Sequence, residues 1–193
     1  MSKIFVAGAT GVIGSRVVPL LVAAGHTVAG TTRSAERADS IRALGAEAVV
    51  VDVFDAAALR AAVVAFAPDV VMHQLTDLPD DARDIPNHPG ANARMRRKGS
   101  RNLIDAATAA GASLVIAQSV AWTLQGDGAA AVEDLERMVL DVNGVVVRYG
   151  QFHGPGTYHV HTIPDAPYIH IDEAARRTLP ALDLRAIVLT ISE

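Results

Sequence analysis

Three glycines near the N-terminus constrain the fold more than any other feature of the sequence. The run KIFVA at 3–7 is typical of a buried strand, and Gly8, Gly11 and Gly14 follow it directly, before a helical pattern over about 12–24. A strand, a tight turn and a helix in this order need glycine, because Cβ atoms would block the turn and hold the backbone away from a bound phosphate. The pattern predicts a turn that binds a pyrophosphate at the helix N-terminus.

The rest of the chain repeats this alternation of short β-branched runs with longer helical patterns. The strands are expected at 3–7, 27–31, 48–51, 70–73, 114–118, 145–148 and 187–191. The helices are expected at about 12–24, 34–44, 56–66, 91–110, 129–141 and 172–182. Such alternation predicts an α/β fold, a doubly wound parallel Rossmann sheet of about seven strands with helices on both faces. Two segments, 77–89 and 151–167, are expected to be irregular and to leave the ligand-binding edge of the sheet.

Composition excludes several classes of function. The 193 residues are 50% hydrophobic and carry a formal charge of -4, which fits one domain and no nucleic-acid partner. The basic cluster over 94–101 is interpreted as a solvated helix face. The chain has no cysteine, and we find no leader and no apolar run long enough to span a membrane. We therefore expect a cytoplasmic protein without disulfides that does not interact with a membrane.

The end of the second predicted strand indicates which nucleotide binds. A carboxylate there would accept the ribose 2′-hydroxyl of NAD, whereas an arginine accommodates the 2′-phosphate of NADP. This chain has Arg33 at that place and no carboxylate until Glu36. The sequence therefore favours NADP over NAD. Asp52 follows the third strand, where it could meet the adenine amino group or serve only as a turn residue.

Several segments together resemble the extended short-chain dehydrogenase/reductase family, in its NAD(P)-dependent epimerase/dehydratase branch. They are VAGATGVIGSRVV, VVVDVFD, VVMHQLT, RKGSRNLIDAATAAGASLVIAQSVA, VVVRYGQFHGPGTY and YIHIDEAARRTLPAL. The resemblance implies a nicotinamide cofactor across the strand ends, a small-molecule substrate, and a homodimer formed through the helices at about 91–110 and 129–141. It implies cofactor contacts at Gly8, Thr10, Gly11, Ile13, Gly14, Arg33, Asp52, Val53 and His73. Ser119 matches the family's catalytic serine.

The chain departs from this family in its catalytic machinery. Members use a Tyr and a Lys four residues apart, in which the Tyr exchanges a proton with the substrate and the Lys lowers its pKa. Aligned on Glu136, this chain has Gly128 and Val132 at those places, and Lys98 is its last lysine. The substrate lobe is also much reduced, to about 151–170, so we expect a single domain over 1–193 with an open, shallow pocket.

Three residues remain candidates for chemistry. Ser119 could bind a carbonyl or cap the local backbone, and Tyr149 could contact a ligand or only pack. His153 is a candidate acid or base because its ordinary pKa lies near neutrality. His153, His159 and His161 are not expected to bind a metal, because no carboxylate is placed beside them to orient the rings.

Three functions are compatible with the sequence. The first is an NADP(H)-binding oxidoreductase or epimerase-like protein that acts on a small carbonyl or hydroxyl compound with a non-standard acid or base. The second is a nucleotide-binding sensor or partner subunit without turnover. The third is a cofactor-independent isomerase, cyclase or hydrolase on the same fold. The glycine turn and Arg33 favour the first two.

Overall fold

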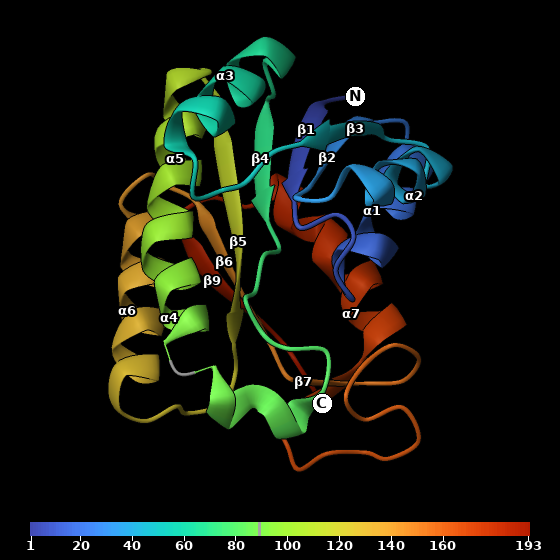
Figure 1. The fold of residues 1–193 in the computed structure, drawn as a ribbon, viewed down its shortest axis with the longest axis vertical. Coiled ribbons are helices and arrows are strands. Elements are labelled where there is room, and N and C mark those ends of the chain that lie inside the picture. The colour runs from blue at the N-terminus through green and yellow to red at the C-terminus, as the bar shows by residue number, and fades with distance from the viewer. Residues whose placement is uncertain (89) are drawn as a thin grey trace.

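The computed structural model describes residues 1–88 and 90–193 and contains a seven-stranded parallel sheet (Figure 1). The strand order is β3-β2-β1-β4-β5-β6-β9. The strands are β1 (Lys3–Ala7), β2 (Thr27–Thr32), β3 (Glu47–Val50), β4 (Val70–His73), β5 (Leu114–Val120), β6 (Val145–Tyr149) and β9 (Ile187–Ile191). The order reverses direction between β1 and β4, which confirms the predicted doubly wound fold.

Helices cover both faces of the sheet (Figure 1). Those on one face are α3 (Ala56–Phe66), α4 (Ala91–Arg94), α5 (Ser100–Ala109) and α6 (Gly126–Leu140). Those on the other are α1 (Gly14–Ala23), α2 (Ala38–Ala43) and α7 (Ile171–Thr178). Alternate residues of β1 feed two separate cores, Ile4 on the α1 side and Phe5 on the α3 side, as expected for a strand buried on both faces.

Three predicted helices differ from the expectation in detail. The helix expected over 91–110 contains a π-helical turn, Met95–Gly99, between α4 and α5. The helix expected over 34–44 begins as a 3-10 turn, Ala35–Arg37, and the one expected over 172–182 ends as another, Leu179–Asp183. Pro180 explains the last change, because its ring cannot continue an α-helical hydrogen-bond ladder.

The expectation that 151–167 is irregular was wrong at its start. Residues Gln151–His153 form β7, which pairs in parallel with β8 (Tyr168–His170) as a separate two-stranded sheet. The intervening residues return to it through a single bridge between His153 and His159. The pairing was missed because each strand has only three residues, too few for alternation to be recognised.

Candidate functional site

The glycine turn has the close backbone packing that the sequence predicts. Gly8 has a φ of +92°, and a Cβ on it would lie 2.8 Å from the carbonyl carbon and oxygen of Gln74. A Cβ on Gly14 would overlap the carbonyl oxygen of Gly8. Gly11 closes the turn, since its N–H donates to the same Gly8 oxygen over 3.1 Å. Only glycine therefore fits at Gly8 and Gly14 without a backbone shift.

The helix that follows the turn presents an uncapped N-terminus. No side chain caps α1, whose N-cap residue is Ile13. The N–H of Ser15 already donates to the Gly11 carbonyl over 3.0 Å, but that of Gly14, the first residue of the helix, has no partner among the described residues, so this group and the positive dipole end are available to an anion. Thr10 and Gly11 are at least partly exposed beside them, whereas Ile13 is buried beneath. This cradle fits the pyrophosphate of a dinucleotide.

Arg33 lies at the carboxyl end of β2 with its side chain 63% exposed. Its Nη1 is 3.9 Å from Asp77 Oδ1, and an exposed ion pair at this distance contributes little to stability. Next to it, Thr31 Oγ1 accepts a hydrogen bond from the Gly8 N–H over 3.2 Å, which joins the end of β2 to the glycine turn. The guanidinium is thus free to meet a phosphate near the turn.

Asp52 and Val53 follow β3 beside the same edge. Asp52 is exposed, and its Oδ1 accepts the Phe54 N–H over 2.8 Å, the geometry of an Asx turn. Val53 is buried, and its carbonyl oxygen accepts from Asn102 Nδ2 over 2.9 Å. Asp52 keeps its second carboxylate oxygen for a ligand, so both of its predicted roles are compatible with this geometry.

His73 ends β4 with both ring nitrogens bonded inside the protein. Its Nδ1 accepts the Leu75 N–H over 3.1 Å, so the proton lies on Nε2, which donates to Ser100 Oγ over 2.9 Å. Burial lowers the pKa of the ring to about 4, with a further contribution from the nearby cation Arg96. The neutral ring of His73 therefore braces β4 against α5.

Ser119, near the end of β5, belongs to a buried charged network that the sequence did not reveal. Its hydroxyl donates to Glu136 Oε1 over 2.6 Å, and Arg148 donates to both Glu136 oxygens over 2.8 and 2.5 Å. Burial raises the pKa of the Glu136 carboxyl, but hydrogen bonds from Arg148 and Ser119 outweigh it and leave the pKa below its ordinary value. Glu136 is thus ionised at neutral pH and cannot serve as an acid.

The hydroxyl of Tyr149 is enclosed in the core. It lies 2.7 Å from Thr178 Oγ1 and 3.4 Å from Gln74 Nε2, and burial raises its pKa to about 12. This enclosure favours the prediction that Tyr149 only packs in the core over the alternative that it contacts a ligand. The other atom of the same amide, Gln74 Oε1, is buried and has no hydrogen-bond partner among the described residues.

His153 lies on β7 against two other rings. Its centroid is 5.2 Å from that of His170 and 5.8 Å from that of Tyr168. Within residues 1–88 and 90–193, no three His, Cys, Asp or Glu side chains are arranged to hold a metal ion. His153 is half-buried, and among the described residues its ring neighbours are Tyr168 and His170, whereas Ser119 bonds Glu136, so the structure does not join the two candidates.

The first half of α6 offers no proton donor where the family resemblance places one. Gly128 lies in the first turn, and a Cβ there would meet only the Leu124 side chain, at 3.6 Å. Val132 is one turn further along and half-buried. A Cβ at Gly128 would be in ordinary van der Waals contact, so the backbone of α6 does not itself require glycine there, but the acid is missing.

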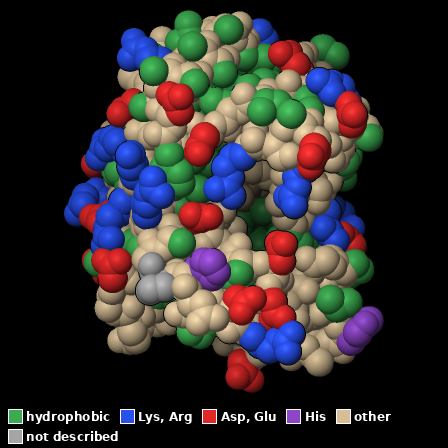
Figure 2. Space-filling model, in the orientation of Figure 1, with side chains coloured by type: hydrophobic (Ala, Val, Ile, Leu, Met, Phe, Trp, Pro, Cys, Tyr) green, Lys and Arg blue, Asp and Glu red, His purple; other side chains and the backbone are tan. Residues whose placement is uncertain are grey.

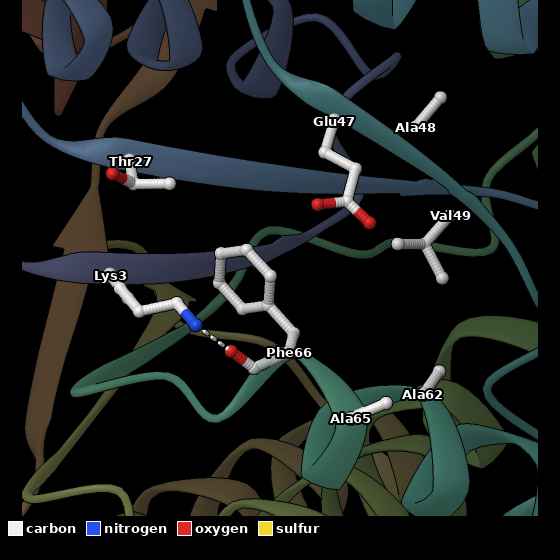
Figure 3. Close-up of a pocket in the computed structure, with 8 residues that line it drawn as sticks. All are labelled: Lys3, Thr27, Glu47, Ala48, Val49, Ala62, Ala65 and Phe66. Carbon is white, nitrogen blue, oxygen red and sulfur yellow. Dashed lines mark hydrogen bonds between the residues drawn. The ribbon is translucent and has the colours of Figure 1, made fainter.

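A hollow is visible on the face drawn in Figure 2, bordered by basic and acidic side chains, between the chain that follows β4 and the half that carries α1 and α7. A different pocket lies at the opposite edge of the sheet (Figure 3). Lys3, Thr27 and Glu47 line it at the starts of their strands, and the Lys3 ammonium lies 4.7 Å from the centre of the Phe66 ring. Because the glycine turn follows a strand end, this second pocket does not belong to the candidate site.

Comparison with known proteins identifies relatives over most of the chain. The model of the NAD dependent epimerase/dehydratase family matches residues 4–138. A 3-diazoavenalumate denitrifying reductase from Streptomyces sp is 33% identical over 226 residues, which cover 95% of this chain and 73% of that protein. The alignment is longer than this chain, so the relative contains segments that have no counterpart here.

Solved epimerase structures share the fold. The UDP-Glc/GlcNAc 4-epimerase of Campylobacter jejuni superposes with a TM-score of 0.82 at 16% identity, over 100% of this chain and 78% of that one. The Bordetella bronchiseptica enzyme WbmH, in complex with NAD+, has a TM-score of 0.76 at 18% identity, over 100% of this chain and 76% of that one.

Among the described residues, no helix is long and apolar enough to span a membrane.

Proposed function

Because the chain belongs to the NAD-dependent epimerase/dehydratase family, we propose that it is an NADP(H)-dependent reductase of a small carbonyl compound or of another small hydride acceptor. The observation that carries this proposal is the glycine turn, in which Gly8 and Gly14 leave no space for a Cβ and α1 is uncapped. A dinucleotide whose pyrophosphate is held by this turn would supply hydride from its reduced nicotinamide. The protein's own residues must bind the cofactor, orient the substrate and manage any proton.

NADP is proposed over NAD because of the residues that follow β2. Arg33 is exposed there, and the nearest carboxylate along the chain that follows is Glu36. A 2′-phosphate would gain a charge-assisted hydrogen bond from the guanidinium, whereas a ribose hydroxyl would gain less. Arg33→Asp is expected to weaken NADPH binding and to spare NADH, as measured by calorimetry. Exposed Arg37→Asp is the matched control and should leave both affinities unchanged.

Ser119 is the residue proposed to orient the substrate. In the structure the Ser119 hydroxyl donates its proton to Glu136, and its oxygen can still accept a hydrogen bond from a donor on the substrate. If the hydroxyl rotates away from Glu136, it can instead donate to a carbonyl oxygen of the substrate. Glu136 stays ionised through its two hydrogen bonds from Arg148 and cannot supply a proton at neutral pH. A carbonyl substrate would therefore take its proton from water, and His153, the proposed non-standard acid, would act on a substrate long enough to reach β7 from Ser119.

A second substrate class is favoured by the missing acid and by the relative's name. The relative is named as a denitrifying reductase of a diazo compound. An aromatic diazonium ion that accepts hydride forms a C–H bond and releases N₂ with the former C–N bonding electrons, so no oxygen anion develops and no acid is needed. Such a reaction is compatible with Gly128 and Val132 at the places of the catalytic pair.

The test follows the loss of NADPH absorbance with benzaldehyde and, separately, with a benzenediazonium salt. Oxidation that depends on protein and substrate supports a reductase, and preference for the diazonium salt assigns the second class. Ser119→Ala should slow the carbonyl reaction by at least about tenfold, while the exposed Ser113→Ala should not. Tight NADPH binding without oxidation of either compound would instead support a sensor or partner subunit.

We also propose a cytoplasmic homodimer that pairs α5 and α6 of two copies. The groove between these helices is lined by Arg97, Lys98, Arg101, Asp134, Arg137 and Met138. Part of the charge is already neutralised, since Arg97 contacts both Asp127 and Asp134 over 2.8 Å. Light scattering at micromolar concentration should give twice the chain mass, and a single-chain mass would refute the dimer.

A further inference from the structure

Arg96 lies on the π-helical turn that interrupts the helix after β4. This turn, Met95–Gly99, inserts one wide turn between α4 and α5, and π-turns of this kind are frequent at functional sites. The turn is fixed on both sides of Arg96. Met95 is buried against Gly99, whose Cβ, if present, would lie 2.6 Å from the Met95 sulfur, and Ser100 is held by His73.

The ionisable groups around Arg96 are bound to other partners or are uncharged. Glu136 is the carboxylate whose charge acts on Arg96, and both of its oxygens accept hydrogen bonds from Arg148 while one also accepts from Ser119. His73, the other titratable group facing Arg96, is neutral at pH 7. Two arginines therefore face one carboxylate, and the cluster carries an excess positive charge.

The guanidinium of Arg96 is half-buried without an anionic partner of its own. No hydrogen bond or ion pair to it is found in residues 1–88 and 90–193, and burial lowers its pKa. None of its nitrogens is among the buried polar atoms without a partner in the described residues, so solvent reaches the guanidinium and an anion could bind it. Its charge acts on His73, at the end of β4, and on Glu136, which binds Ser119 near the end of β5, so the guanidinium lies close to the place proposed for the reacting part of a substrate.

We propose that Arg96 is a specificity-determining residue that binds a carboxylate on the substrate. A planar guanidinium matches a carboxylate through two parallel hydrogen bonds, a geometry that neither a hydroxyl nor an amide reproduces. The substrate class is thus a small organic acid that also carries the hydride-accepting group. The inference rests on the proposed reductase function for the location of the substrate, but the binding of a carboxylate can be measured without turnover.

The first experiment measures binding of benzoate and of its neutral isostere benzamide, by calorimetry and by the rise in Tm, with and without NADP+. Wild-type protein should bind benzoate more tightly than benzamide. Arg96→Gln should weaken benzoate binding by about tenfold to 100-fold, because the charged hydrogen bonds to the carboxylate are lost. Arg96→Lys should weaken it by less, because the ammonium keeps the charge but cannot form two parallel hydrogen bonds. Arg60→Gln, at an exposed position of α3, is the matched control and should bind benzoate as wild type does.

Two results would overturn the inference. One is equal benzoate affinity in wild type and Arg96→Gln, or no preference for benzoate over benzamide. The other is a loss of NADPH affinity in Arg96→Gln with benzoate binding intact, which would assign the guanidinium to the cofactor. If benzoate binding depends on Arg96 but neither test compound oxidises NADPH, the carboxylate site stands and the proposed reductase activity fails.

A stability measurement separates ligand binding from a structural role. Because Arg96 has no ion pair in the described structure, Arg96→Gln should have a Tm equal to or above that of wild type without ligand. A lower Tm would show that the guanidinium holds the fold together and would contradict the inference. With a benzoate concentration that saturates wild type, the order should reverse, because the bound carboxylate stabilises wild type more than the variant.

Discussion

His73 makes the free energy of unfolding depend on pH in a defined window. Burial, aided by Arg96, lowers the pKa of the folded ring from 6.5 to about 4. The unfolded chain therefore takes up a proton at a pH where the folded chain does not, and stability is lost as the pH falls from about 6.5 towards 4. One pKa unit corresponds to about 1.4 kcal/mol, so the whole window is worth about 3 kcal/mol at this residue.

The perturbation is His73→Gln, whose amide can still donate to Ser100 but does not titrate. Urea unfolding at about pH 7 and about pH 4.5 should show that wild type loses about 2 kcal/mol more than the variant between the two. His161→Gln is the control, because this exposed loop histidine should leave the pH dependence of wild type unchanged. If His73→Gln loses as much stability as wild type, the folded ring titrates normally and the burial argument is refuted.

Three further substitutions test the site. Glu136→Gln leaves Ser119 and the 42% exposed Arg148 without their carboxylate and should cost about 1–3 kcal/mol in urea unfolding, and a loss below about 0.5 kcal/mol would contradict a stabilising role of this network. Gly14→Ala introduces a Cβ that overlaps the Gly8 oxygen, so calorimetry should find NADPH binding abolished or stability reduced by about 1–3 kcal/mol, whereas wild-type behaviour would disprove the close approach. Tyr149→Phe should cost about 1 kcal/mol and leave kcat unchanged, and a large fall in kcat would restore its catalytic alternative.

The sequence predicted the sheet because local patterns determine it. A strand buried on both faces is a continuous apolar run, and each such run here is followed by a helical period, as in 3–7 and 12–24. The glycine turn was equally readable, since Gly8 and Gly14 are required by backbone geometry alone. The π-helical turn at Met95–Gly99 was not, because the helical period continues through it and only tertiary packing selects the wider turn.

The network around Glu136 shows why part of the site could not be predicted. Ser119, Glu136 and Arg148 come from β5, α6 and β6, and their meeting depends on register between elements rather than on spacing along the chain. One signal was available, namely an arginine inside the apolar run VVVRY, which requires a partner if it is even partly buried. A residue of this kind in a parallel strand indicates an acidic residue on the adjacent helix.

Calorimetric titration with NADPH, and separately with NADH, tests the central claim most directly. The account predicts that wild type binds NADPH more tightly than NADH, and that Arg33→Asp removes this preference while Arg37→Asp does not. Equal affinities would refute the role of Arg33 and leave the glycine turn intact. No heat with either nucleotide would contradict the account as a whole, because the turn would then serve the fold without holding a cofactor.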